Sequence, residues 1–197
     1  EGAELREVFS RCLTRAPGGA QLVVTRHGEI IADVAGGGVG RDTPIQLFSV
    51  SKLIVAIAAA HAHAAGVIDL DAPLSGYWPA FARPETAAIT ARMILDHSSG
   101  ISAVTRPLSI EDLVAGALEK EVEVQDPLWE PGTQHGYGAF TYGALMAGVF
   151  IQGAGVSVQD YVAEHVTGPT GNGFIFGAQT MEARAARALS ASATSMS

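Results

Sequence analysis

The apolar run LIVAIAAAHAHAAGVI, residues 53–68, constrains the fold of this chain more than any other segment. It is shorter than the ~20 residues that a membrane-spanning helix needs, and two histidines interrupt it. We therefore predict a buried helix from about Val50 to Ala65, which Gly66 ends, and no membrane span.

Few segments in the rest of the sequence have a strand pattern. The segment QLVVTRHGEIIADVAGG predicts two strands around a turn at His27-Gly28, after a helix at residues 4–15. Helices and loops are expected up to about residue 166, followed by one possible strand, GFIFG at 173–177, and an unpatterned tail. Because a two-stranded sheet is not independently stable, these strands need more partners than the chain obviously supplies.

Composition and charge exclude several classes of protein. Hydrophobic residues make up 48% and charged residues 16% of the 197 residues, which is a globular composition. The net charge of −8, without a basic block, excludes a nucleic-acid binder. The single cysteine, Cys12, excludes an internal disulfide and is expected to be buried in its helix. We predict a cytoplasmic protein, although the first residue, Glu1, leaves the true start and any processing open.

The stretch FSVSK, residues 48–52, contains two serines and a lysine. Serine is a common helix N-cap, so the stretch alone could be an ordinary helix start. If the helix begins near Val50, Ser49 and Lys52 share a face, whereas Ser51 and Lys52 point about 100° apart. Desolvation makes a lysine amine available as a base, and a serine paired with a lysine is an activated nucleophile. The pattern predicts Ser49 as the nucleophile and Lys52 as its base.

A glycine-flanked tyrosine lies in the stretch WEPGTQHGYGAFTYG. Tyr137 is expected in a loop, where a tyrosine can transfer protons if a nearby cation lowers its pKa. Tyr142 falls inside the next helical pattern, so we expect it to pack in the core.

Three stretches together, FSVSK, ITARMILDHSSG and PGTQHGYGAFTYG, resemble the serine β-lactamase and penicillin-binding superfamily. The similarity is closest to the class C-like carboxylesterases, often called family VIII esterases, and it runs from about residue 18 to residue 177. It implies a β-lactamase-like α/β (α+β) fold, with an antiparallel sheet lobe and a helical lobe. It also implies acylation of Ser49, with Lys52 as the base partner and Tyr137 as the tyrosine of the Tyr-x-Asn motif.

Two departures from the family pattern stand out. Ala139 replaces the Asn or Ser of the Tyr-x-Asn motif, so the side-chain amide that would contact an acylamino group is absent. The family's third motif, Lys/His-x-Gly, has no match after Tyr137. We therefore expect residues 1–197 to be the N-terminal portion of one hydrolase domain, with an incomplete sheet that a second polypeptide or a C-terminal segment completes. Within it, residues 1–48 would form a helix and the first strands, residues 49–170 the helical lobe, and residues 171–197 a strand and a frayed tail.

The resemblance implies a serine hydrolase acting through an acyl-enzyme, most simply a carboxylesterase on small esters. Two alternatives stay open: a β-lactamase or D-Ala-D-Ala peptidase, and a non-catalytic fragment or binding module of the same fold.

The remaining polar residues are candidates for pocket-lining, structural or metal-binding roles. His135 lies two residues from Tyr137 and is a candidate to line the substrate pocket, beside Ala139. His97 in DHSSG is expected to make structural bonds, and Asp69 and Asp71 to cap a turn. His61 and His63, two apart on a helix, face different ways, so no metal site is expected. The glycine run at 36–40 lacks a phosphate-loop pattern, and no cofactor motif is visible.

Overall fold

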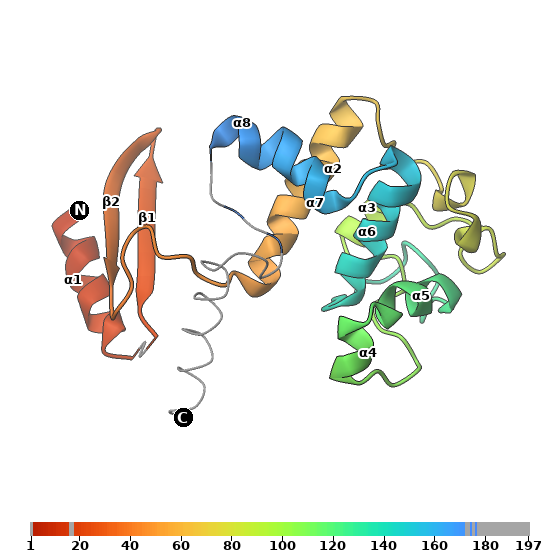
Figure 1. Ribbon diagram of the computed structural model, residues 1–197, viewed down its shortest axis with the longest axis horizontal. Coiled ribbons are helices and arrows are strands. Elements are labelled where there is room, and N and C mark those ends of the chain that lie inside the picture. The colour runs from red at the N-terminus through yellow and green to blue at the C-terminus, as the bar shows by residue number, and fades with distance from the viewer. Residues whose placement is uncertain (1, 16–17, 172–173, 175, 177–197) are drawn as a thin grey trace. The chain divides into compact units, whose positions relative to one another are not determined.

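A computed structural model describes residues 2–15, 18–171, 174 and 176 of this chain (Figure 1). The chain divides into two compact units. Among the described residues, one comprises residues 2–15, 18–47 and 176, and the other comprises residues 48–171 and 174.

The first unit contains helix α1 (Gly2–Leu13) and an antiparallel hairpin of β1 (Ala20–Arg26) and β2 (Glu29–Gly36). The turn at His27-Gly28 has φ of 52° and 84°, the positive values that a two-residue type I′ hairpin turn requires. The predicted helix, strands and turn are thus confirmed, with α1 beginning two residues earlier than expected. The expectation of a buried Cys12 is wrong, because the thiol is exposed.

Helix α1 packs against β2 at the end of the hairpin. A Cβ atom on Gly36 would lie 2.6 Å from Leu13 Cδ1, so glycine lets the helix approach the strand closely.

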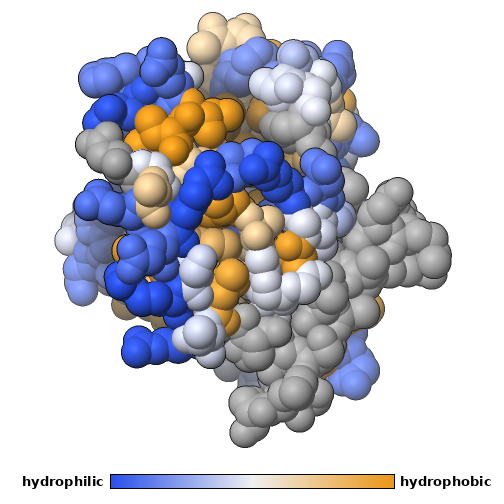
Figure 2. Space-filling view, turned by 90° about the vertical axis from the view of Figure 1, so that its left-hand side faces the viewer, coloured by the Kyte–Doolittle hydropathy of each residue, from blue (hydrophilic) through white to orange (hydrophobic). Residues whose placement is uncertain are grey.

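Figure 2 shows a face on which hydrophilic side chains surround smaller hydrophobic patches. Val23 and Ile30 of the hairpin are among the exposed large hydrophobic side chains, so the hairpin leaves part of its apolar surface uncovered.

The second unit is helical. A 3-10 turn, η1 (Phe48–Val50), leads into helix α2 (Ser51–Ala64), which confirms the predicted apolar helix. The elements that follow are η2 (Leu74–Gly76), η3 (Pro79–Phe81), α3 (Ala91–Leu95), α4 (Ile110–Val114), α5 (Ala117–Val124), α6 (Thr141–Ala154), α7 (Val158–Val162), η4 (Ala163–Thr167) and α8 (Gly168–Thr170). The segment SIEDLVAGALEKE forms two helices, because Gly116 adopts a φ of 76° between α4 and α5.

The core of this unit surrounds α6. Met146, Val149 and Phe150 of α6 are completely buried, and Gly148 lies against the indole of Trp78. Serine caps begin two helices of this unit, with Ser109 in a capping box before α4 and Ser157 accepting the Asp160 N–H before α7. This packing gives α2, α3 and the loop before α6 a common support.

The possible strand at residues 173–177 lies largely outside the described residues. Within the described part, no single helix is long and apolar enough to cross a membrane. The bent pair Thr141–Ala154 and Val158–Thr170 meets the length and composition criteria together, but α6 is mostly buried in the core. The cytoplasmic location stays a prediction.

Candidate active site

Ser49 and Lys52 lie together at the start of α2. Ser49 is exposed in the 3-10 turn, and Lys52 is half-buried one turn further along the helix. The Lys52 Nζ donates to Ser49 Oγ at 3.1 Å and to the backbone carbonyl of Ala139 at 3.0 Å. The amine is thus held between the serine hydroxyl and a loop that follows 87 residues later.

Ser51 points elsewhere, as the helical spacing predicts. Its hydroxyl donates to the Phe48 carbonyl at 2.6 Å, which closes the turn before the helix. Phe48 has a φ of 45° and a side chain that is 70% exposed, so the residue before Ser49 adopts a backbone conformation that is unusual for a bulky side chain.

Two tyrosines surround the Lys52 amine. Its Nζ lies 5.0 Å from the ring centroid of Tyr137 and 5.6 Å from that of Tyr142. Hydrogen bonding with Ser49 and, second, with Lys52 lowers the pKa of Tyr137 from its usual 10. Burial raises the pKa of Tyr142 to about 12, and its hydroxyl donates to the Lys52 carbonyl at 3.1 Å. Tyr142 packs in the core as expected, and Tyr137 is the tyrosine suited to exchange a proton.

The loop that carries Tyr137 pairs with the turn at residues 96–100, which contains the HSSG stretch. Three backbone bonds join them: Leu128 N–H to the Gly100 carbonyl (2.8 Å), Gly132 N–H to the Ser98 carbonyl (2.9 Å) and Gly136 N–H to the His97 carbonyl (3.0 Å). We call these two segments, residues 96–100 and 127–138, the turn–loop ladder.

One glycine permits this close approach. A Cβ atom on Gly100, whose φ is 83°, would lie 2.7 Å from both Pro127 Cβ and the Trp129 carbonyl oxygen. A second glycine shapes the loop itself, because a Cβ atom on Gly136 would lie 2.2 Å from the Trp129 ring. Gly100 is therefore needed where the two segments meet, and Gly136 where the loop packs on its own tryptophan.

His97 adds a side-chain bond to the turn–loop ladder. Its Nδ1 accepts the Gly138 N–H at 3.2 Å, and its ring packs 5.0 Å from that of Tyr137 and 5.4 Å from that of Tyr142. Burial and the nearby Lys52 charge lower the pKa of His97 from its usual 6.5. His97 thus makes the structural bonds expected of it, and their partner is the loop of the candidate site.

The two candidate substrate-binding residues lie on either side of Tyr137. Ala139 takes part through its backbone, because its carbonyl accepts from Lys52. His135 is exposed on the loop and lies near enough to His97 for its charge to influence that residue's pKa. Contact of either with substrate stays a prediction.

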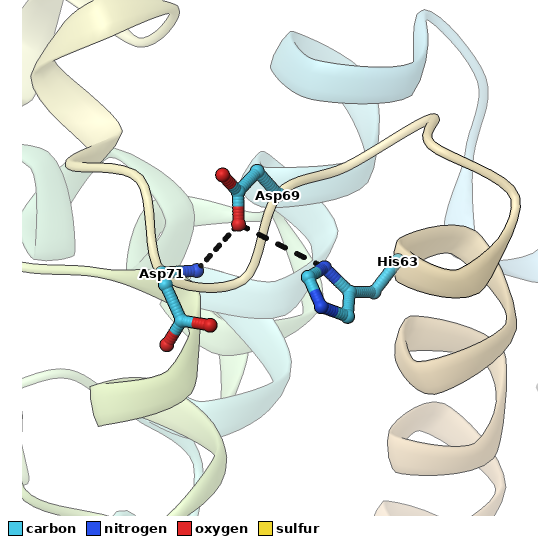
Figure 3. Close-up of side chains that lie close together, drawn as sticks. All are labelled: His63, Asp69 and Asp71. Carbon is cyan, nitrogen blue, oxygen red and sulfur yellow. Dashed lines mark hydrogen bonds and ion pairs between the residues drawn. The ribbon is translucent and has the colours of Figure 1, made fainter.

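A cluster of possible metal ligands lies apart from Ser49 and consists of His63, Asp69 and Asp71 (Figure 3). One ligand atom of each, a ring nitrogen or a carboxylate oxygen, lies within 4.8 Å of the others. Arg92 engages both carboxylate oxygens of Asp71, and Asp69 Oδ1 accepts the Asp71 N–H at 3.0 Å. His63 Nδ1 accepts the Leu70 N–H at 3.3 Å. These bonds close the turn after α2, in line with the expected turn-capping role of the two aspartates.

Two contributions to the candidate site were not predicted from the sequence. The first is the Ala139 carbonyl, since a pattern of side chains says nothing about backbone acceptors. The second is the bond from Gly138 to His97. The only local signal for it is a histidine before SSG, where the backbone has a φ of 66° that histidine tolerates better than most residues.

The chain is similar to known proteins in sequence and in fold. A family model described as Beta-lactamase matches residues 5–195. Esterase EstB from Burkholderia gladioli is 39% identical over 113 residues, which cover 50% of this chain and 29% of EstB. Esterase/beta-lactamase LipL from Mycobacterium tuberculosis is 29% identical over 140 residues, which cover 67% of this chain and 32% of LipL.

A solved structure has a similar fold. The crystal structure of a family VIII carboxylesterase matches with a TM-score of 0.76 at 28% identity, covering 86% of this chain and 49% of that chain. The chain therefore spans about a third of the length of the curated relatives and about half of the solved structure.

Proposed function

Because this chain belongs to the beta-lactamase family, we propose that it is a serine hydrolase that forms an acyl-enzyme on Ser49 and acts on small esters. The observation that carries the proposal is the position of the Lys52 amine, 3.1 Å from Ser49 Oγ and held by the Ala139 carbonyl. With one N–H directed to that carbonyl, a neutral amine can turn its lone pair toward the serine hydroxyl.

The proposed reaction has two halves. Ser49 Oγ attacks the ester carbonyl carbon while its proton passes to Lys52, and the negative charge moves to the carbonyl oxygen. The bond to the alcohol oxygen then breaks, and Tyr137 transfers a proton from Lys52 to that oxygen. Water attacks the acyl group with its proton passing back through Tyr137 and Lys52, which releases the acid and restores Ser49.

The N-terminal end of α2 supports the charged intermediate. The Ser49 N–H lies at the start of the helical segment, where backbone N–H groups and the helix dipole stabilise a negative oxygen. The names of the relatives support hydrolysis of esters, since EstB and LipL are both called esterases.

The test is covalent labelling of the protein in full length with a fluorophosphonate. We expect the adduct on Ser49, no labelling in Ser49→Ala, and labelling in the matched control Ser51→Ala. Arginine cannot accept the serine proton, so Lys52→Arg should lose turnover by about 10³-fold or more. An adduct on Ser51, or a fully active Lys52→Arg variant, would refute the assigned roles. No labelling at all would favour a non-catalytic binding module.

A second candidate function is β-lactam hydrolysis, which the name of LipL, an esterase/beta-lactamase, favours. We give esters precedence because Ala139 offers no side-chain amide to a β-lactam's acylamino group, and because the exposed rings of Phe48 and Phe140 adjoin Ser49 and Ala139 in the chain. Apolar side chains at these positions suit the acyl or alcohol part of an ester.

Substrate preference can be measured with two chromogenic compounds. We expect kcat/KM for a short p-nitrophenyl ester to exceed that for nitrocefin. Ala139→Asn should raise the nitrocefin value about tenfold relative to the ester, as expected for one added hydrogen bond, whereas the similarly sized Ala139→Leu should not. Equal turnover of both substrates by the parent protein would contradict the ester preference.

A further inference from the structure

His97 occupies a central place in the turn–loop ladder. Its backbone carbonyl accepts the Gly136 N–H and its Nδ1 accepts the Gly138 N–H, so one residue bonds the loop on both sides of Tyr137. The next carbonyl after Gly138, that of Ala139, holds the Lys52 amine. The two bonds of His97 therefore hold the loop on both sides of Tyr137, next to the carbonyl that accepts from Lys52.

The bond to Gly138 determines the protonation of the ring. A backbone N–H can only donate, so Nδ1 must carry its lone pair and the proton of the neutral ring must be on Nε2. Protonation of Nδ1 would break this bond and bring a positive charge close to the Lys52 amine. The groups that face the ring and share this electrostatic environment are Lys52 of α2, Asp96 of the turn, His135 and Tyr137 of the loop, and Tyr142 of α6.

The cavity beside His97 has no room for a substrate. His97 borders a cavity of about 10 Å³, whose lining includes Thr141 and Tyr142. This volume holds at most one water molecule. His97 therefore acts on the loop and does not contact a substrate from the cavity.

We propose that His97 is the positioning residue of the site: its neutral, Nε2-protonated ring holds the Gly138 N–H and thereby sets Tyr137 and the Ala139 carbonyl on the Ser49–Lys52 pair. The proposal rests on the proposed function in assigning proton transfer to Tyr137. The geometric part, that the ring positions Tyr137, can be tested without turnover.

Two substitutions at position 97 separate the bond from the backbone. His97→Asn keeps an acceptor near the place of Nδ1 and tolerates the φ of 66°. His97→Gly accepts the same φ but has no acceptor. Both remove the ring, so a difference between them reports the acceptor.

The first measurement is the tautomer in the unsubstituted protein, read from the ¹⁵N shifts of labelled histidine at neutral pH. We expect a protonated Nε2 and an unprotonated Nδ1 for His97. A proton on Nδ1 would overturn the proposal, and this result does not depend on the folding of any variant.

The second measurement is the titration of Tyr137, followed by absorbance or by NMR. In His97→Gly the pKa of Tyr137 should return toward 10, whereas in His97→Asn it should stay closer to that of the parent. An unchanged Tyr137 titration in a folded His97→Gly variant would overturn the proposal. These outcomes stand even if no ester is hydrolysed, so they distinguish a failure of the positioning role from a failure of the proposed function.

The third measurement is ester turnover by the protein in full length. His97→Gly should lower kcat at least tenfold with KM within about twofold, and His97→Asn should recover most of the lost kcat. An equal loss in both variants, or a change in KM alone, would overturn a role through the loop.

Discussion

Phe48 holds an unusual backbone conformation directly before Ser49. A positive φ of 45° costs energy for an aromatic residue, and here it occurs in a residue that is 70% exposed. The hydroxyl of Ser51 bonds the Phe48 carbonyl and so helps to hold the turn. The two serines of the stretch therefore have different tasks, since Ser49 faces the Lys52 amine and Ser51 closes the turn that presents it.

The tyrosines differ in a way that a titration can show. The chain has four tyrosines, and only Tyr137 has a lowered pKa, whereas burial raises the pKa of Tyr77 and Tyr142 to about 12 and raises that of Tyr161. Phenolate absorbance should therefore show one tyrosine that ionises below pH 10. This step should vanish in Tyr137→Phe and persist in the control Tyr161→Phe. A lowest step that survives Tyr137→Phe would contradict the assignment.

The same shifts determine how stability depends on pH. The pKa of Tyr137 is lower in the folded state than in the unfolded chain, so its contribution to stability grows between its folded pKa and pH 10, and is lost again as the pH falls through that folded pKa. Tyr77 and Tyr142 have the opposite sign, because between about pH 10 and 12 the unfolded chain ionises while the buried phenols do not. Alkaline unfolding should therefore begin above pH 10.

Some residue-scale features follow from spacing alone. The approach of Lys52 to Ser49 could be predicted because residues three apart on a helix share a face. The bond from Gly138 to His97 joins residues 41 positions apart, and the positive φ of Phe48 runs against the preference of its residue type. Neither has a local pattern, so both required the three-dimensional structure.

At the scale of elements, helix α6 carries a matched pair of glycines. A Cβ atom on Gly148 would lie 2.0 Å from the indole of Trp78, whereas one on Gly143 would have no neighbour within 4 Å. Gly148→Ala should lower the free energy of unfolding by about 1–3 kcal/mol through overpacking. Gly143→Ala should raise it by up to about 1 kcal/mol through helix propensity. Denaturant-induced unfolding of both variants measures these free-energy changes. A stabilised Gly148→Ala variant would contradict the close packing.

The elements differ in how well sequence predicts them. The α2 helix and the hairpin at His27-Gly28 follow from strong local patterns, an apolar run and a two-residue turn. The break between α4 and α5 depends on a single glycine, Gly116, that a propensity pattern passes over. The turn–loop ladder joins two segments of irregular structure, so only its glycines were visible in the sequence, without the reason for them.

At the scale of the whole molecule, apolar surface remains uncovered in each unit. Val50, at the N-cap of α2, and Leu53 and Ile57 within α2 form an exposed apolar stripe, at positions that share a helical face. The described sheet has two strands, fewer than a stable sheet needs, and Val23 and Ile30 on it are exposed. LipL, EstB and the solved carboxylesterase are each about two to three times as long as the part of their own chain that matches this one. We propose that a further polypeptide, continuous or separate, covers these surfaces and completes the sheet.

This proposal predicts that residues 1–197 alone lack ester turnover and bind a hydrophobic dye strongly, because exposed apolar patches invite dye binding and association. Leu53→Gln and Ile57→Gln should reduce dye binding by the isolated chain, since they interrupt the stripe. In the protein purified from its own cells the same substitutions should instead lower stability, because there the stripe is covered. Native mass spectrometry of that protein should reveal either a longer chain or a second polypeptide. The idea fails if residues 1–197 alone form a monomer that unfolds cooperatively and hydrolyses esters as fast as the purified protein.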